Sequence, residues 1–320
     1  MPPAPLPVRN GLNPTRLRLP DDGRWATVLD YLLQRFPEDA ARVREKVAAG
    51  EVVNGDGRQI DERSPFVPRS FVYLYRDPPV ETRVPFEIDI LHRDENLLVV
   101  DKPHFLASTP RGAHVVESAL VRLRCELGLP ELSPVHRLDR LTAGVLVFTV
   151  RREVRGAYQT LFDERRVRKE YEATALYEPA LAFPRTIRSR IVKERGVLAA
   201  RQVPGPANSE TSVELRDVHD GLARYRLSPA TGKTHQLRVH MNALGIAIVN
   251  DNFYPSFYEV AVDDYSAPLQ LLARSLAFRD PFSGVERRFE SRRQLDTVSR
   301  GERRNLQRAP LAKTVTWITP

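Results

Sequence analysis

Apolar residues recur with a helical period in two stretches near the start of the chain. In "WATVLDYLLQRFP" (25–37) the apolar side chains fall on one stripe at Val28, Leu29, Leu32, Leu33 and Phe36. That spacing predicts an amphipathic helix, and "ARVREKVAAG" (41–50) predicts a second helix that ends at Gly50. The turn signals Asn54-Gly55 and Asp56-Gly57 follow, so we expect a tight turn between short strands. Residues 21–80 thus form a predicted small α+β module behind a proline-rich arm, residues 1–20.

Strand-like and helix-like runs mix without a regular rhythm from about residue 84 onward. Strands are predicted at both ends of "FEIDILHRDENLLVVDKP" (86–103), around a polar turn at 92–96, and at 144–150, 169–177 and 222–229. Helices are predicted at 152–167 and 231–245. No repeated strand–helix–strand unit is visible, so we expect an α+β domain with a mixed, largely antiparallel sheet. This domain would cover residues 84–295, behind a linker at 76–85.

The charge balance points to a polyanionic partner, but only modestly. The 320-residue chain is 42% hydrophobic, enough for a sizeable core, and carries a formal net charge of +8. A basic surplus favours nucleic acid ahead of a membrane surface. Arginine, however, outnumbers lysine 43 to 6, and GC-rich coding also produces that bias.

Much of the surplus lies at the end of the chain. Residues 284–320 hold nine basic and four acidic residues, whereas residues 1–85 are nearly neutral. For the basic C-terminal extension, residues 296–320, we expect "TVTWIT" (314–319) to dock as a strand and present the arginines to RNA phosphates. A packed extension with solvated arginines is the alternative.

Several classes of protein are disfavoured by what is missing. Cys125 is the only cysteine, which excludes an internal disulfide and a cysteine-based zinc site. The seven histidines are scattered, so we expect no metal and no cofactor. No signal peptide and no membrane-spanning apolar stretch is visible, so a cytoplasmic monomer is expected.

One carboxylate stands in a marked setting. In "SPVHRLDRLTAGVLVF" (133–148), Asp139 lies between Arg137 and Arg140, directly before a predicted strand. Two guanidinium groups this close favour the ionised carboxylate. An ionised aspartate can be a nucleophile, a base or a metal ligand, or it can be half of a structural ion pair.

The stretch "TGKTHQLRVHM" (231–241) is the second constellation. The helical period gives a buried stripe of Leu237, Met241 and Leu244, and a neighbouring polar stripe of His235, Arg238 and Asn242. Gly232, Lys233 and Thr234 would lie at the helix start, where free N–H groups favour an anion. A phosphate-binding P-loop is excluded, because that motif needs a glycine at 227, which is Leu227.

Three further stretches carry weaker signals. Lys169 and Tyr171 alternate along a predicted strand and so share one face. Lys102 is a charge at the end of the apolar run "LLVV". A predicted strand and turn at 245–254 carries Asp251 and Tyr254.

In this order the motifs resemble those of the RluA family of RNA pseudouridine synthases. The family pattern is "DKP", "HRLDxxTSG", "KxY", "GRTHQIRVH" and "GxPIxGDxxY". The chain has the corresponding stretches at 101–103, 136–144, 169–171, 232–240 and 245–254. It departs at Ala143 (usually Ser), Lys233 (commonly Arg) and Asn250 (usually Gly). These differences bear on the shape of the loops, and hence on which RNA is bound.

The resemblance implies a role for each matching residue. Asp139 matches the nucleophile, Tyr171 the tyrosine that packs on uracil, and Arg238 the arginine paired with the aspartate. Arg137 matches the arginine that takes the place of a flipped-out nucleotide. We expect the surrounding basic side chains to contact RNA as well: His136, Arg137, Arg140, Lys169, Lys233 and His235.

The resemblance also implies isomerisation of specific uridines in structured RNA, without metal or cofactor. The 21–80 module resembles the alpha-L RNA-binding module through "KVAAGEVVNGDGRQID" (46–61), with a degenerate packing module as the alternative. That module makes ribosomal RNA the first expected substrate and transfer RNA the second. The rival functions are a non-catalytic RNA-binding relative and a glycosidase, which would need two carboxylates at a defined separation.

Overall fold

The computed structural model describes residues 4–78 and 80–296, which divide into two units. One unit runs up to residue 80 and includes residues 121–130; the other contains residues 81–120 and those from 131 on. Helix α3 (Ala119–Leu127) spans the division. The predicted extension at 296–320, with its strand at 314–319, lies outside the described residues except for Asp296.

The N-terminal unit has two helices and a three-stranded sheet. Helix α1 (Val28–Arg35) begins with a capping box between Thr27 and Asp30, and α2 (Ala40–Ala48) follows it. The sheet order is β1 (Thr15–Arg18), β3 (Phe71–Leu74), β2 (Val52–Asn54). The predicted arm, residues 1–20, is therefore wrong at its end, because β1 pairs with β3 and Leu19 is fully buried.

The turn after β2 forms as predicted, but its second strand does not. The Asn54 side chain accepts the N–H groups of Asp56 and Arg58, which closes the turn. A single bridge joins Val53 to Gln59, and the ladder partner of β2 is β3 instead. Backbone hydrogen bonds from Asn54 N–H to Arg58 O (2.9 Å) and from Ile60 N–H to Val52 O (2.8 Å) make a short hairpin contact, while the sheet itself joins β2 to the distant β3.

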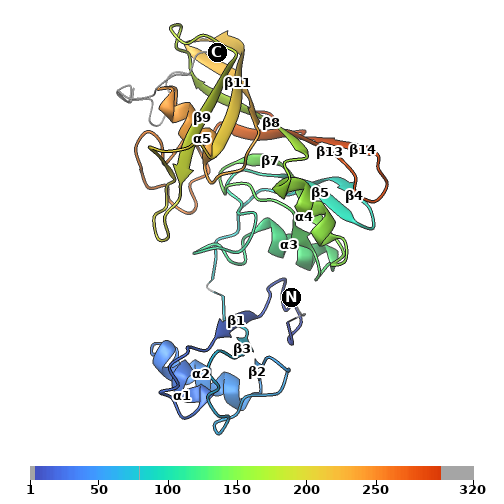
Figure 1. Ribbon diagram of the computed structural model, residues 1–320, viewed down its shortest axis with the longest axis vertical. Helices are drawn as coiled ribbons and strands as arrows, with labels where there is room; N and C mark the ends of the chain where they lie inside the picture. The colour runs from blue at the N-terminus through green and yellow to red at the C-terminus, as the bar shows by residue number, and fades with distance from the viewer. Residues whose placement is uncertain (1–3, 79, 297–320) are drawn as a thin grey trace. The chain divides into compact units, whose positions relative to one another are not determined.

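The larger unit is built on one mixed, mostly antiparallel sheet (Figure 1), which confirms the predicted fold class. The main strand order is β10-β9-β11-β12-β8-β13-β7-β5-β4; β14 also pairs with β13, and β6 with β7. Only the pair of β7 and β13 is parallel among the described strands. The strands are β4 (Asp89–Arg93), β5 (Leu97–Lys102), β6 (Ser133–Pro134), β7 (Ala143–Thr149), β8 (Val167–Leu176), β9 (Arg185–Val192), β10 (Arg201–Val203), β11 (Ser209–His219), β12 (Leu222–Pro229), β13 (Leu271–Arg279) and β14 (Glu286–Glu290).

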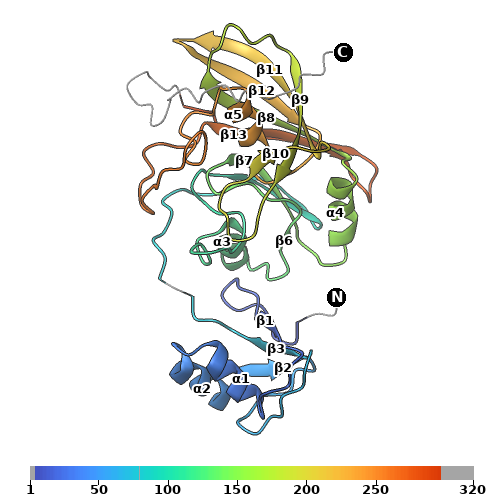
Figure 2. The same ribbon diagram turned by 60° about the vertical axis from the view of Figure 1, so that its left-hand side comes forward.

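Two helices of this unit pack on different parts of the sheet (Figure 2). Helix α4 (Arg155–Asp163) covers its centre through Tyr158 and Leu161. The core there consists of Leu97, Val99, Val145, Val147, Val154, Tyr158, Leu161, Val167, Leu276 and Phe278. Helix α5 (Gln236–Ala243) lies against β9 and β11. The two helices thus pack on different groups of strands, α4 on β5, β7, β8 and β13 and α5 on β9 and β11.

The start of β7 needs a glycine. Gly144 has φ +111°, and a Cβ added there would lie 2.2 Å from the Ala273 carbonyl oxygen on β13. No L side chain fits this parallel contact. The close approach of the two strands therefore fixes where the preceding loop, which carries Asp139, leaves the sheet.

Candidate active site

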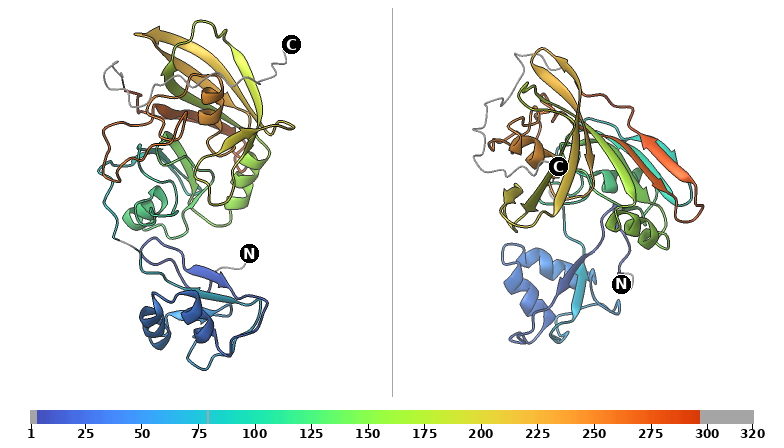
Figure 3. Two further views of the ribbon diagram at one scale, coloured as in Figure 1. Left: turned by 90° about the vertical axis from the view of Figure 1, so that its left-hand side faces the viewer. Right: turned by 45° about the horizontal axis from the view of Figure 1, so that its top comes forward.

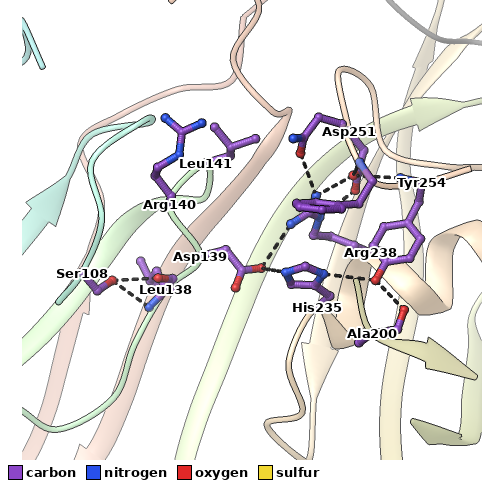
Figure 4. A network of polar contacts seen from close by, with 12 residues as sticks. Ser108, Leu138, Asp139, Arg140, Leu141, Ala200, His235, Arg238, Asp251 and Tyr254 are labelled. Atoms are coloured by element: carbon purple, nitrogen blue, oxygen red, sulfur yellow. Dashed lines mark hydrogen bonds and ion pairs between the residues drawn. The ribbon is translucent and has the colours of Figure 1, made fainter. Parts of the chain in front are cut away.

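Asp139 lies on the loop between β6 and β7, and this loop is clamped from one side. Ser108 Oγ donates a 2.8 Å hydrogen bond to the Leu138 carbonyl and accepts one of 3.0 Å from the Leu138 N–H. The Thr142 N–H donates to the Asp139 carbonyl at 3.0 Å. Both backbone groups of the residue before Asp139 are thus held by one side chain (Figure 4).

Two further side chains, from the last residue of β5 and from the segment after it, hold the carbonyls that follow Asp139. Lys102 Nζ donates to the Arg140 carbonyl at 3.2 Å, and also to the carbonyls of Pro103 and Leu106 at 2.8 Å. Burial lowers the pKa of Lys102 well below its usual range, and the negative charge of Asp139 opposes that shift. Three carbonyl acceptors also favour the ammonium, because only that form has three N–H donors.

His104 completes this clamp. Its Nδ1–H donates to the Leu141 carbonyl at 2.6 Å. Burial lowers the pKa of His104 to about 4, so the ring is neutral at pH 7 and still donates. Residues 102–108 therefore fix the backbone on both sides of Asp139, a role that the sequence patterns did not reveal for Ser108 or His104.

Arg238 reaches Asp139 from α5. Its Nη1 lies 3.5 Å from Asp139 Oδ2, and its side chain is only 2% exposed. The sequence predicted a polar stripe for Arg238, but every residue from Gln236 to Met241 is buried. The predicted buried stripe of Leu237, Met241 and Leu244 is confirmed, but Arg238 on the polar stripe is buried as well and bonds internally to Asp251.

Asp251 is the partner that keeps the buried guanidinium charged. It accepts hydrogen bonds of 2.7 Å from Arg238 Nε and 2.6 Å from Nη2. Burial works against the charge, but these bonds and the charge of Asp251 raise the pKa of Arg238 above its usual value. Because Asp251 occupies Nε and Nη2, the remaining nitrogen, Nη1, is directed at Asp139. The 245–254 stretch, predicted as strand and turn, forms no strand.

His235 is the second group that faces the carboxylate. Its Nε2 lies 3.9 Å from Asp139 Oδ2, and its Nδ1 lies 3.1 Å from the Tyr254 hydroxyl. That hydroxyl donates its single proton to the Ala200 carbonyl at 2.7 Å, so it accepts from His235 Nδ1–H. Burial lowers the pKa of His235, which favours the neutral ring. The Nε2 lone pair of that ring faces Asp139.

The two arginines that flank Asp139 in the sequence are not its partners in space. Arg140 Nη1 donates to the Phe105 carbonyl at 3.4 Å, and its side chain points away from the carboxylate (Figure 4). Arg137 is exposed. The expectation that Arg137 and Arg140 hold Asp139 is wrong, because adjacent side chains on a turning loop point in different directions. Arg238 and His235, far away in sequence, lie nearest instead.

Tyr171 and Lys169 lie on β8, as predicted. Burial raises the pKa of Tyr171, and the negative charge of Asp139 raises it further. The Tyr171 hydroxyl is therefore neutral at pH 7. Lys169 Nζ donates to the Thr231 carbonyl at 3.1 Å. Lys169 thus has an internal partner and holds the segment before α5.

Two other basic residues are placed differently from the prediction. The His136 ring stacks on Phe162 at 4.9 Å between centroids, and its Nε2 accepts the Val147 N–H. Burial lowers the pKa of His136 to about 3, so it is neutral and bonded internally rather than poised for a phosphate. Helix α5 begins only at Gln236, so Gly232, Lys233 and Thr234 precede it and form no helical anion site. The Lys233 side chain is exposed.

The assembled site is a carboxylate on a fixed loop, facing a buried cation and a neutral imidazole. The Asp139 side chain is 31% exposed, so a ligand can reach it from the open side. Within residues 4–78 and 80–296, no cluster of three or more metal-binding side chains is present. In the same part of the chain, no helix has the length and apolar character to cross a bilayer.

The comparison with known proteins shows the family of the domain that carries this site. A family model described as RNA pseudouridylate synthase matches residues 96–243, which include Asp139, Tyr171 and Arg238. The dual-specificity RNA pseudouridine synthase RluA of Salmonella typhi is 33% identical over 213 residues, which is 63% of this chain and 91% of that protein. The chain belongs to the RluA family of RNA pseudouridine synthases. It is thus an isomerase that converts uridine to pseudouridine in RNA, as the motifs predicted.

Two further relatives agree with the family. RluA of Escherichia coli K12 is 34% identical over 178 residues, or 52% of this chain and 77% of that protein. The solved structure of human RNA pseudouridylate synthase domain containing 4 superimposes with a TM-score of 0.51 at 26% identity, over 65% of this chain and 89% of that one. The matched part of the family is the sheet domain that carries the site.

Proposed function

We propose that this RluA-family enzyme isomerises specific uridines in structured RNA, with Asp139 as the nucleophile and the target nucleotide flipped out of its helix. The observation that carries the proposal is the setting of the Asp139 carboxylate. Its Oδ2 lies 3.5 Å from Arg238 Nη1 and 3.9 Å from His235 Nε2, while the group is still 31% exposed. A held carboxylate that a substrate can reach suits covalent catalysis.

The reaction needs no oxidant, because it only rearranges bonds. The C1′–N1 bond breaks, the uracil turns, and C1′ bonds to C5; C5 loses a proton and N1 gains one. Attack by Asp139 at ribose C1′ and attack at uracil C6 both require the carboxylate to touch the nucleoside. Arg238 then stabilises the carboxylate before attack and again when it departs.

A paired uridine cannot present C1′ and C6 to a protein carboxylate, so the nucleotide has to leave the stack. Arg137 is exposed and lies two residues before Asp139 on the same loop. Its planar guanidinium can fill the space that a departed base leaves, because it stacks on aromatic faces. Arg137 and Lys233, both exposed, are the basic side chains proposed to contact RNA here.

The rival functions fit the site less well. A non-catalytic RNA-binding relative has no need to keep Asp139, Tyr171 and Arg238 near one another. Here Arg238 pairs with Asp139, and the charge of Asp139 contributes to the raised pKa of Tyr171. A glycosidase needs a second reactive carboxylate. Asp251 is the nearest candidate, but it is 1% exposed and bonded to Arg238 and two backbone N–H groups. It therefore cannot act on a sugar.

Ribosomal RNA is the proposed first substrate and transfer RNA the second. The alpha-L-like stretch of the N-terminal unit supports the first, and the RluA relatives, which are named dual-specificity enzymes, leave room for both. The N-terminal unit adds little phosphate affinity in this proposal. Its cations Arg42 and Lys46 already pair with Asp77, so few phosphates would be neutralised.

The test is to map pseudouridines across the transcriptome of the source cells with and without the gene. We expect one or a few sites in ribosomal RNA to disappear and to return with the wild-type gene but not with Asp139→Asn. Loss of sites only in transfer RNA would overturn the order of substrates. Sites that persist without the gene, or that Asp139→Asn restores, would overturn the proposed function.

A further inference from the structure

A large exposed aromatic side chain lies beside the site without a part in the chemistry. Phe257 is 55% exposed and belongs to the loop that follows α5, drawn in orange in Figure 3. Its ring centroid lies 5.6 Å from that of Phe253, with 34° between the planes. Single exposed apolar side chains are ordinary on protein surfaces, so what sets Phe257 apart is its contact with Phe253.

Phe253 lies between the Phe257 ring and the site and contacts both. It packs against a buried cluster of Ile191, Ala200, Val239 and Tyr254. Its centroid lies 5.2 Å from the His235 ring and 5.1 Å from the Arg238 guanidinium carbon. From Asp139 outward, the order is thus Arg238 and His235, then Phe253, then the exposed face of Phe257.

The neighbouring loop brings apolar surface and a cation to the same side. The Tyr254 hydroxyl donates to the Ala200 carbonyl, which places Ala200 beside the start of the Phe257 loop. Leu198, two residues earlier, is 67% exposed. Lys193 is a basic residue of the same segment, and its charge contributes to the lowered pKa of His235. Aromatic rings beside cations are what single-stranded RNA binding uses, with bases stacked on rings and phosphates beside charges.

We propose that Phe257 stacks on a nucleobase of the substrate RNA, next to the uridine that enters the site at Asp139. The proposal rests on the proposed function, because that function places the target uridine at Asp139. Stacking on a phenylalanine face tolerates any base, so Phe257 contributes affinity for an unpaired neighbour rather than reading its sequence. The substrate would therefore present an unstacked nucleotide beside the target.

A purely structural role for Phe257 makes different predictions. A ring that only covers Phe253 can be replaced by Leu, which keeps the apolar contact but has no π face. A ring that stacks on a base tolerates Tyr and fails with Leu. Phe282, in the turn between β13 and β14, is also 55% exposed and provides a matched control.

The experiment measures site-resolved initial rates on total RNA from cells that lack the gene, over a range of RNA concentrations. Phe257→Ala and Phe257→Leu should raise KM roughly thirtyfold, the middle of the range for one lost base stack, with kcat little changed. Phe257→Tyr and Phe282→Ala should match the wild type, and all variants should keep the wild-type melting temperature. A wild-type KM for Phe257→Leu, or an equal rise for Phe282→Ala, overturns the proposal.

A second measurement uses a short stem-loop that carries the mapped uridine, with an abasic residue at each flanking position in turn. One abasic position should raise the wild-type KM to that of Phe257→Ala and leave Phe257→Ala unchanged. Equal losses for both enzymes at every position contradict the stacking. A wild-type enzyme that is inactive on both total RNA and the stem-loop would overturn the proposed function as well. An active enzyme whose KM does not change with substitutions at Phe257 would overturn this inference alone.

Discussion

Arg238 donates two hydrogen bonds to the Asp251 carboxylate, from Nε at 2.7 Å and from Nη2 at 2.6 Å, and both side chains are buried. The third nitrogen, Nη1, is left for Asp139 at 3.5 Å. Asp251 thereby does two things at once. It offsets the cost of burying the guanidinium, and it sets the direction of the nitrogen that faces the Asp139 carboxylate.

The first prediction concerns this pair. Asp251→Asn should lower both stability and kcat, because it leaves a buried guanidinium without its counter-charge. Removing one partner of a buried pair costs about 3 kcal/mol or more. Thermal unfolding and single-turnover kinetics measure the two losses. The matched control is Glu210→Gln, which breaks the exposed pair with Arg188 and should change neither. Full activity in Asp251→Asn would contradict the role given to Arg238.

The second prediction concerns the clamp on the Asp139 loop. Ser108→Ala leaves both backbone groups of Leu138 without their partner. A shift of the loop should lower kcat by between about tenfold and a hundredfold, with little change in RNA affinity. Ser70, which donates to the Val67 carbonyl in the N-terminal unit, supplies the control Ser70→Ala. An equal effect of both changes would mean that the clamp has no special part in catalysis.

Sequence periodicity predicted the individual elements of the larger unit better than their arrangement. The strands β5, β7 and β12 and the helix α4 were predicted at 86–103, 144–150, 222–229 and 152–167, because local residue patterns encode single elements. The parallel contact of β7 with β13 joins residues about 130 positions apart, such as Ala143 and Leu272. No local pattern encodes such a pairing.

The site was predicted in its residues and in one contact, the pair of Arg238 with Asp139, but not in its other contacts. Asp139, Tyr171 and Arg238 were found through motif order, and the structure brings them together. The prediction that Arg137 and Arg140 hold Asp139 was wrong, because sequence spacing does not predict the direction of a side chain on a loop. A helical pattern likewise cannot distinguish a buried ion pair from a solvated charge. The burial of Arg238 with Asp251 was therefore not predicted.

The third prediction concerns Tyr171. Tyr171→Phe keeps the ring and removes the hydroxyl, so RNA binding should survive and activity should fall much less than for a change at Asp139. Filter binding and product formation on the same RNA give the two quantities. Complete inactivity of Tyr171→Phe would assign the hydroxyl a chemical role beyond packing on uracil.

The fourth prediction is a pH dependence of stability. The pKa of His136 is about 3 in the folded protein, against about 6.5 for a free histidine. Below pH 6.5 the unfolded chain therefore binds a proton that the folded chain does not, and stability falls with pH. For this residue the loss reaches roughly 2 kcal/mol at pH 5.

Denaturant unfolding at several pH values measures that slope. His136→Phe keeps the stacking on Phe162 and should flatten the fall between pH 6.5 and 4, whatever its effect on absolute stability. His219→Asn, a change at an exposed histidine, should leave the slope unchanged. The same slope in all three proteins would show that His136 is not held neutral.

The most direct measurement of the central claim is tritium release from RNA labelled at uridine C5, comparing the wild type with Asp139→Asn. The substitution keeps the size of the side chain and removes the charge that Arg238 and His235 face. If Asp139 is the nucleophile, we expect tritium release by the wild type and none by Asp139→Asn, with RNA affinity within a few-fold of the wild type. Substantial release by Asp139→Asn would contradict the claim that this carboxylate is the nucleophile.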